Sequence, residues 1–272
     1  MAAAFPAGGL PMSDAPFKDH FSGHAAAYAA ARPVYPGALF DWLAAQCPRR
    51  ELVWDAGCGN GQASVALAMH FRRVHAGDPS AAQIAAAAPH PRVTYVVERG
   101  ERCGLPDASA DLATVAQALH WFDLTAFYAE VRRVLRPGGV IAAWTYGSNR
   151  IEGADDPGID ALLRTLHDDT LGPHWPPERR HVAAGYRDLP FPFTEIAAPD
   201  FILRCDWTLP QYRAYLASWS AAQRHLAATG RDAIAEVAPA LQAAWGDPQQ
   251  TRAVIWPLAL RIGRVMETIT VS

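Results

Sequence analysis

The sequence predicts an α/β fold in which a mainly parallel sheet is covered by helices on both faces. From residue 51 to about 147, apolar strand-like runs alternate with alanine-rich or amphipathic helical runs, the pattern of successive β-α-β units. A glycine-rich loop follows the first strand-like run and opens the first helical run. Half of the 272 residues are hydrophobic, enough to bury the core of one large domain.

The strands and helices of the first half can be assigned in order. The expected strands are ELVWDAG (51–57), RVHAGD (73–78), RVTYVV (92–97), DLATVAQAL (111–119) and VIAAWTY (140–146). The expected helices are QASVALAMHF (62–71), SAAQIAAAA (80–88) and LTAFYAEVRRVL (124–135), with Asp123 as the N-cap of the last. The next four residues, RPGG, are typical of a helix end.

The second half has a different composition. EIAAPDFILRCDWTL (195–209) predicts a sixth strand or a bent pair, and AVIWPLALRIGRV (253–265) a last strand. LPQYRAYLASWSAAQRHL (209–226) and AIAEVAPALQAAW (233–245) have helical character. Trp207, Trp219 and Trp245 either line a cap over the sheet or pack in the core.

Composition excludes several classes of function. The formal net charge is −3 and no long Lys/Arg run occurs, which argues against nucleic-acid binding. No uncharged apolar run is long enough for a membrane span. The four cysteines are scattered without a CxxC, so a reducing cytoplasm is expected. The ten histidines show no metal-ligand spacing such as HExxH, so no metal site is expected.

The stretch LVWDAGCGNGQ (52–62) predicts a ligand-binding loop. Gly57, Gly59 and Gly61 follow a strand, at the sheet edge where open α/β proteins bind ligands. The spacing is GxGxG, whereas a dinucleotide fingerprint reads GxGxxG. Asp55 stands two residues before the first glycine, where a carboxylate would repel a pyrophosphate and favour a cation. S-adenosylmethionine carries an ammonium and a sulfonium and no phosphate, so it is the ligand this loop favours, with Asp55 meeting the ammonium directly or through water.

A second carboxylate supports a nucleoside ligand. Asp78 ends the second expected strand, where it can accept both ribose hydroxyls, as in nicotinamide cofactor sites. The alternative is that Asp78 is the N-cap of the next helix, since DPSAAQ (78–83) has good capping chemistry.

These motifs, together with those flanking them, resemble the class I S-adenosylmethionine-dependent methyltransferases. The likeness is to the type 11 small-molecule group that includes trans-aconitate methyltransferase-like proteins. It rests on FSGHAAAYAAARPVYP (21–36), VWDAGCGNGQ (53–62), GDPS (77–80), GLPDASADLATVAQALHWFD (104–123) and EVRRVLRPGGVIAAWTYG (130–147), about half of the chain.

The resemblance implies a Rossmann-like, seven-stranded, mostly parallel sheet with a reversed last hairpin and a helical cap. It implies one domain made of a leader expected to be disordered (1–16), an N-terminal helical lid (17–50), a cofactor-binding half (51–147) and a C-terminal half with cap insertions (148–272). The residues implied to bind the cofactor are Asp55, Gly57, Cys58, Gly59, Gly61, Asp78, Pro79, Gly100, Glu101, Gln117, Ala118, His120, Tyr28 and Arg32. Gly100–Glu101 matches the adenine segment, and Gly100 stands where relatives often have alanine.

Few residues are candidates for the chemistry itself. His120, at the expected end of the fourth strand, is the candidate base. It is equally well explained as a core histidine or one that shapes the cofactor pocket. Tyr146 is a second, weaker catalytic candidate, and Trp121 and Tyr35 are candidate substrate contacts. His167 and His174 are further candidates to face the acceptor.

Arg32 shares a helix face with Tyr28, four residues earlier. It grips either the cofactor's carboxylate or an acidic substrate, or it stacks on a nearby tyrosine at the surface.

The sequence therefore predicts an S-adenosylmethionine-dependent methyltransferase that acts on a small molecule in the cytoplasm, as a monomer or homodimer. O-methylation of a carboxylate or a hydroxyl by in-line transfer is the expected reaction. The alternatives are a non-catalytic S-adenosylmethionine-binding protein and an NAD-dependent oxidoreductase. The glycine spacing, Asp55 and the absence of a Tyr-x-x-x-Lys pair after the fourth strand argue against the oxidoreductase.

Overall fold

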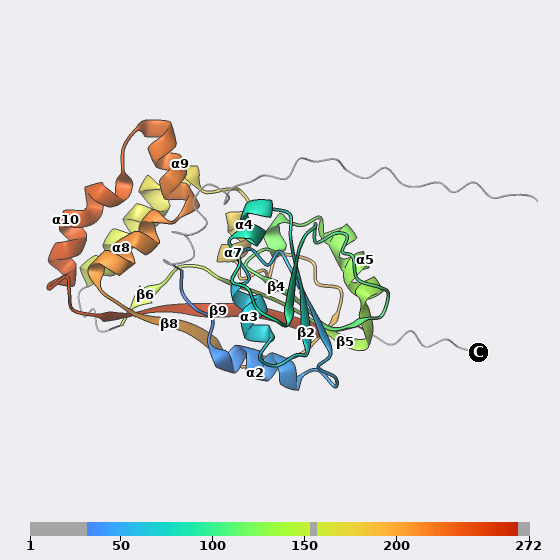
Figure 1. The fold of residues 1–272 in the computed structure, drawn as a ribbon. Helices are drawn as coiled ribbons and strands as arrows, with labels where there is room; N and C mark the ends of the chain where they lie inside the picture. The colour runs from blue at the N-terminus through green and yellow to red at the C-terminus, as the bar shows by residue number, and fades with distance from the viewer. Residues whose placement is uncertain (1–31, 153–156, 266–272) are drawn as a thin grey trace, which may run out of the picture.

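The computed structural model describes residues 32–152 and 157–265. Its centre is one mixed β-sheet with helices packed around it (Figure 1). The predicted leader, Tyr28 and the first part of the predicted lid (17–31) lie outside the described residues. Along the sheet the order is β3 (Val93–Val97), β2 (Arg73–Asp78), β1 (Leu52–Ala56), β4 (Ala110–Ala116), β5 (Leu135–Tyr146), β9 (Arg252–Arg264) and β6 (Arg150–Ile151). Two more strands, β7 (Thr194–Glu195) and β8 (Phe201–Trp207), also pair with β9.

The strand directions confirm the predicted reversal of the last strand. β1 to β5 are parallel, and β9 runs antiparallel to β5. β8 is antiparallel to β9 and therefore parallel to the first five strands. The described residues form nine strands rather than seven, because the short β6 and β7 add two-residue pairings to β9.

The central strands are apolar along their whole length because both faces of the sheet are covered. Every residue of β1 is buried, and successive side chains enter opposite cores. Val53 packs in the core that contains α2 (Gly37–Ala45) and α3 (Gln62–Leu67), and Trp54 packs in the core that contains α5 (Leu124–Val134).

Two segments differ from the sequence prediction. RPGG lies inside β5, because α5 ends at Val134 and the strand begins at Leu135. Gly138, with φ +74°, accommodates an irregularity where the β4–β5 register shifts between Ala110 and Leu112. The described part of the predicted lid contains α2, which is packed in the core through buried residues including Leu39 and Leu43.

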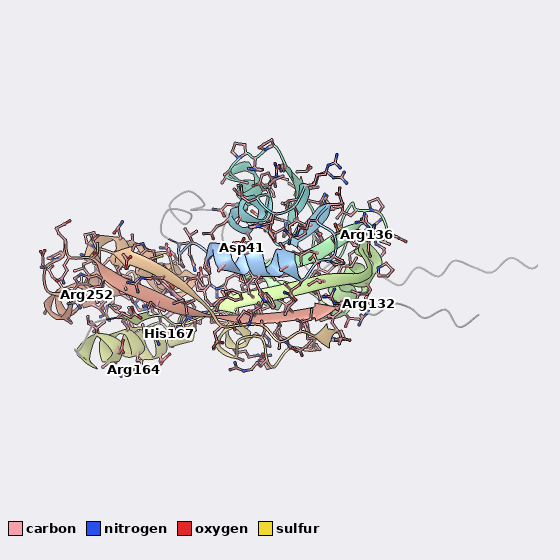
Figure 2. All side chains as sticks on the ribbon, turned by 90° about the horizontal axis from the view of Figure 1, so that it is seen from below. Asp41, Arg132, Arg136, Arg164, His167 and Arg252 are labelled. Carbon is pink, nitrogen blue, oxygen red and sulfur yellow. The ribbon has the colours of Figure 1, made fainter. Side chains whose placement is uncertain are left out.

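The cap comes from two segments that leave the sheet and return to it. One runs between β6 and β7 and contains α6 (Pro157–Arg164), a π-helix (Thr165–Thr170), a 3-10 helix (Gly172–His174) and α7 (Arg179–Ala183). The other, between β8 and β9, contains α8 (Leu209–Ala217), α9 (Ser220–Thr229) and α10 (Ala233–Trp245). Helices α8 to α10 gather at one end of the molecule (Figure 1). In Figure 2, Arg252 and His167 lie at that end, and Arg132 and Arg136 lie at the opposite one.

The helix predicted over 209–226 is divided into α8 and α9. Trp219 takes an extended backbone conformation as the N-cap of α9, and its ring contacts Trp175 and Tyr215. Trp245 is fully buried against Tyr212. No helix among residues 32–152 and 157–265 has both the length and the apolar character needed to cross a bilayer.

Candidate active site

The glycine loop joins β1 to α3 and lies at the carboxyl edge of the parallel strands. Gly57, Gly59 and Gly61 have φ of +68°, +54° and +81°, a region that favours glycine. A Cβ on Gly57 would lie 2.7 Å from Ala118 Cβ, and one on Gly61 would overlap the Tyr95 hydroxyl. A Cβ on Gly59 would meet only Gln83, at 3.8 Å. The outer two glycines therefore permit close packing of the protein, and Gly59 leaves open space above the loop.

Asp55 lies at the end of β1 beneath this loop and is fully buried. Its two carboxylate oxygens accept hydrogen bonds from Ser64 Oγ at 2.5 Å and Thr114 Oγ1 at 2.7 Å. Burial raises the pKa of Asp55 to about 6, although these two hydrogen bonds oppose the shift. The direct contact with a ligand ammonium expected from the sequence is not available to a carboxylate enclosed in this way. Asp55 instead joins Ser64, in α3, to Thr114, in β4, beneath the loop.

Asp78 fastens the loop to the neighbouring strand. One carboxylate oxygen accepts a hydrogen bond from the Gly59 main-chain N–H, and the other accepts one from the Ser80 N–H, both at 2.8 Å. The N-cap of α4 (Ala81–Ala85) is Ser80, which accepts a hydrogen bond from Gln83 N. The alternative interpretation of Asp78 as the helix cap is therefore wrong. Pro79 lies between these two residues and is partly buried.

Cys58 is buried inside the loop, with its thiol directed to the Gly59 carbonyl. Burial, together with the nearby Asp55 and Asp78, raises its thiol pKa above the usual range. The thiol is therefore inert near neutral pH.

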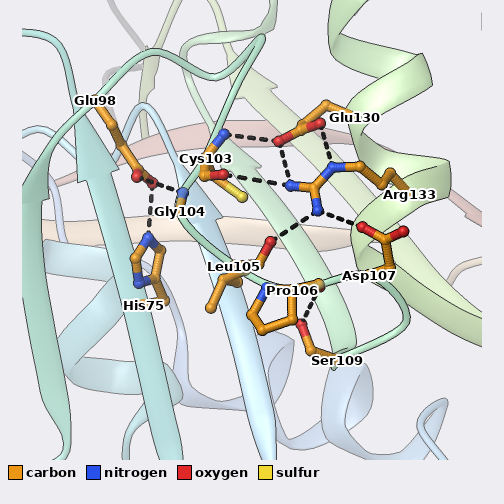
Figure 3. A network of polar contacts seen from close by, with 10 residues as sticks. All are labelled: His75, Glu98, Cys103, Gly104, Leu105, Pro106, Asp107, Ser109, Glu130 and Arg133. Carbon is orange, nitrogen blue, oxygen red and sulfur yellow. Dashed lines mark hydrogen bonds and ion pairs between the residues drawn. The ribbon is translucent and has the colours of Figure 1, made fainter.

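The segment matched to adenine binding leads into a loop that is held by a network of polar contacts (Figure 3). Arg133 donates to the carboxylates of Glu130 and Asp107 and to the carbonyls of Cys103 and Leu105. Glu98 contacts His75 Nε2 at 2.7 Å and accepts from Gly104 N at 3.0 Å. These contacts fix the segment that follows Glu101.

Glu101 itself faces the start of α5, where Asp123 is the N-cap. It accepts a hydrogen bond from Asp123 N at 3.0 Å and pairs with Arg99 at 3.5 Å. Gly100 is buried, and a Cβ there would come within 2.9 Å of the Phe122 ring. The predicted adenine segment and the 117–123 segment are thus packed together.

A cavity of about 600 Å³, including its open mouth, lies between the carboxyl ends of β4 and β5 and the cap. None of residues 55–61 lines it, but Ala118 and Phe122, which lie next to Gly57, follow the lining residues Gln117 and Trp121 in the chain. Its lining is predominantly aromatic and basic, with no carboxylate, and consists of Arg32, Gln117, His120, Trp121, Tyr146, Gly147, Trp175, Pro176, Arg179, Val182, Tyr215, Trp219 and Ser220. In the part of the chain that the structure describes, no group of three or more His, Cys, Asp or Glu side chains is placed to hold a metal ion.

His120 lies in the cavity wall, with Nδ1 2.9 Å from the Tyr186 hydroxyl. Burial, together with the nearby positive charge of Arg179 and His181, lowers the pKa of His120 to about 3. The imidazole is therefore neutral and a weak base near pH 7. This environment fits the alternative in which His120 shapes the pocket.

The other predicted site residues are divided between the cavity and the core. Gln117, with φ +60°, donates to the Tyr146 carbonyl and accepts from Tyr146 N, which fixes the turn after β4. Arg32 reaches the Tyr146 hydroxyl at 3.4 Å. Tyr35 packs on Trp144 and on the ring of Tyr146 in the core and does not line the cavity.

Several cavity residues escaped the sequence prediction. Arg179, Trp175 and Tyr215 come from the cap segments, as does Tyr186, which contacts His120 from outside the lining, and no spacing in the sequence distinguishes them. The only signal is the aromatic and basic stretch LGPHWPPERR (171–180), which includes Trp175 and Arg179. His167 and His174 lie just outside the lining, where His167 contacts the Trp175 ring.

Comparison with known proteins agrees with the fold and the loop. A family model described as a methyltransferase domain, of the type 11 group, matches residues 54–143. A Dictyostelium discoideum protein named as a methyltransferase is 32% identical over 231 residues, covering 84% of this chain and 87% of the relative. A Mycolicibacterium smegmatis protein named as S-adenosylmethionine-dependent is 37% identical over 131 residues, 47% of this chain and 49% of the relative. A solved structure from Anaeromyxobacter dehalogenans, described as a type II methyltransferase, has 52% identity and a TM-score of 0.81, with 86% and 98% of the two chains covered.

The fold and loop define a Rossmann-like class I methyltransferase. The chain belongs to the methyltransferase family, and it is an S-adenosylmethionine-dependent enzyme. Its glycine loop fits that ligand, because Gly59 leaves a bare backbone beside the Asp78 carboxylate. The narrower resemblance to trans-aconitate methyltransferases stays a prediction.

Proposed function

We propose that this enzyme transfers the methyl group of S-adenosylmethionine to an oxygen, carboxylate or hydroxyl, of a small organic molecule. The observation that carries the proposal is the cavity of about 600 Å³ beside the glycine loop. Aromatic and basic side chains from the sheet edge and from the cap line it together, the mixture of apolar walls and few polar groups that small-molecule sites have. A Dechloromonas aromatica relative, named as a malonyl-[acyl-carrier protein] O-methyltransferase, supports oxygen as the acceptor atom; it is 35% identical over 133 residues, 48% of each chain.

The roles of the loop residues follow from their contacts. In this proposal Asp78 accepts the ribose hydroxyls, and the backbone at Gly59 lies against the ligand. The buried charge of Asp55 favours the ligand's cationic groups, and Gly100–Glu101 borders the adenine. When bound, S-adenosylmethionine supplies a methyl carbon already activated by sulfonium. The protein's task is then largely to position the acceptor in line and to exclude water.

The test is calorimetric titration of the protein with S-adenosylhomocysteine and, separately, with NAD. We expect S-adenosylhomocysteine to bind and NAD not to bind. The Gly59→Val variant should lose binding, because its side chain would occupy the space above the loop.

Gly230→Val is the matched control for this variant. Gly230 also has a left-handed φ, of +71°, with open space around it, and it caps α9 in the helical cap. Both variants add the same side chain and incur a similar backbone strain. Equal binding by Gly59→Val and Gly230→Val would contradict the assignment of the loop. Binding of S-adenosylhomocysteine without methyl transfer to any acceptor would favour a non-catalytic binding protein.

A further inference from the structure

The acceptor cavity is cationic, and its positive charge comes from two side chains. Arg32 and Arg179 both line it, and no described residue of the lining is a carboxylate. Arg32 lies over the Tyr215 ring, at 5.8 Å from the centroid, and Arg179 lies over the Trp175 ring at 5.0 Å. A pocket that holds two guanidinium groups in an aromatic wall is suited to an anion.

Arg179 is the more informative of the two. Within residues 32–152 and 157–265, no acidic side chain lies within ion-pair distance of it. Its guanidinium charge is costly there, because burial lowers the pKa of Arg179 and the nearby Arg32 lowers it further. By contrast, Arg133 and Arg261 each pair with a carboxylate. A partly buried arginine that stacks on an aromatic ring, with no carboxylate partner among the described residues, is placed to bind an anion that enters the cavity.

The structure also bears on which acceptor oxygen reacts. A hydroxyl must lose its proton during transfer, and a carboxylate has none to lose. His120 is a neutral, weakly basic imidazole bonded to Tyr186. The other described side chains of the lining offer no carboxylate to remove a proton. A carboxylate acceptor therefore matches both the charge and the missing base.

We propose that Arg179 binds the carboxylate of the acceptor, and that the acceptor is a small organic acid methylated on a carboxylate oxygen. This rests on the proposed function and names its substrate class. A lone pair of the carboxylate oxygen forms the bond to the methyl carbon as the carbon–sulfur bond breaks. The bonding pair stays on sulfur, which becomes a neutral thioether, and no proton is released. The product is a neutral methyl ester that no longer pairs with Arg179.

The aromatic wall indicates the rest of the acceptor. The ring centroids of Trp175 and Trp219 lie 5.6 Å apart, and the ring centroid of Tyr215 lies 5.7 Å from that of Trp219. With Trp121 they offer the apolar part of the lining. An acid with a planar or branched apolar body fills such a pocket better than a compact hydrophilic one.

The experiment measures transfer of radiolabelled methyl groups to matched acceptors. The probes are 3-phenylpropionate, cinnamate and 4-methylpentanoate, each beside its primary amide and its alcohol. Label in a methyl ester is released as methanol by alkali, whereas label in an ether is not. We expect alkali-labile label from the acids and none from the amides or alcohols. We also expect each methyl ester to bind at least about tenfold more weakly than its acid, because the ester has lost the charge.

Arg179→Gln is the test variant, and Arg180→Gln is its matched control. Arg180 is the next residue of α7 and is exposed. We expect Arg179→Gln to lower kcat/KM for the acids by roughly thirtyfold or more, as loss of one partner of a desolvated charge pair does. Arg179→Lys should recover part of the loss, because it keeps the charge without the bidentate geometry. Arg180→Gln should change little.

Two results would overturn the inference. One is alkali-stable label from alcohols with none from acids, and the other is equal kcat/KM for Arg179→Gln and Arg180→Gln. Failure to label any acid while S-adenosylhomocysteine still binds would also count against it. If the unmodified protein does not bind S-adenosylhomocysteine, that result would instead contradict the proposed function. Binding of this compound to each variant, measured in parallel, shows that the variant is folded.

Discussion

Replacement of Asp55 by asparagine should stabilise the protein, and the gain should depend on pH. The carboxyl group is fully buried, and burial raises its pKa from an ordinary value of 3.8 to about 6. A shift of about two units corresponds to about 3 kcal/mol that the ionised form costs the folded state. A neutral asparagine side chain would avoid this cost and still accept a hydrogen bond from Ser64 or Thr114.

The sign follows from proton binding. Between pH 3.8 and about 6 the folded protein holds the Asp55 proton more tightly than the unfolded chain does. The contribution of this group to stability is therefore lost as the pH rises through that window. The difference in unfolding free energy between Asp55→Asn and the unmodified protein should be about 0.5 kcal/mol at about pH 4 and approach 3 kcal/mol at about pH 7.

Urea unfolding of both proteins at the two pH values measures this difference directly. Other groups titrate over the same range, but they do so in both proteins and cancel in the comparison. The slopes of the two transitions must agree for the free energies to be comparable. If the difference in unfolding free energy between the two proteins is the same at both pH values, the raised pKa of Asp55 is not its cause. The same variant should bind S-adenosylhomocysteine more weakly, because the buried negative charge that favours the ammonium is gone.

Three further predictions test the site. Asp78→Ala should weaken binding of S-adenosylhomocysteine by about 1.5–3 kcal/mol through loss of charged hydrogen bonds; unchanged affinity by calorimetry would remove Asp78 from the ribose site. Arg133→Ala should lower the unfolding free energy by about 2 kcal/mol, because the mostly buried Glu130 loses its partner; equal urea midpoints would contradict this. For an acid acceptor, measured with saturating S-adenosylmethionine so that titration of Asp55 does not limit cofactor binding, kcat/KM should be independent of pH between about 6 and 8, because His120 is neutral throughout that range. A limb near pH 6.5 that the His120→Gln variant abolishes would restore His120 as a base.

The first half of the fold could be predicted because its signals are local. Buried parallel strands are continuous apolar runs, and the sequence places Asp55 and Asp78 at the ends of two of them. The register of the pairs Asp55–Ala76 and Asp78–Val97 then brings these strand ends to one edge. RPGG was misassigned because glycine and proline are compatible with both a helix end and a strand irregularity.

The class of protein can be predicted from the residue pattern, because the alternation of strands and helices, the GxGxG loop and the acids at the strand ends depend on spacing along the chain. The contacts of each side chain follow only from the packed fold. It enclosed Asp55 between Ser64 and Thr114, bonded His120 to Tyr186, and brought Arg179 to the same cavity as Arg32. Most of these partners are tens of residues or more apart in the chain, and burial, which sets the pKa of Asp55 and of His120, is a property of the packed molecule and not of the local sequence.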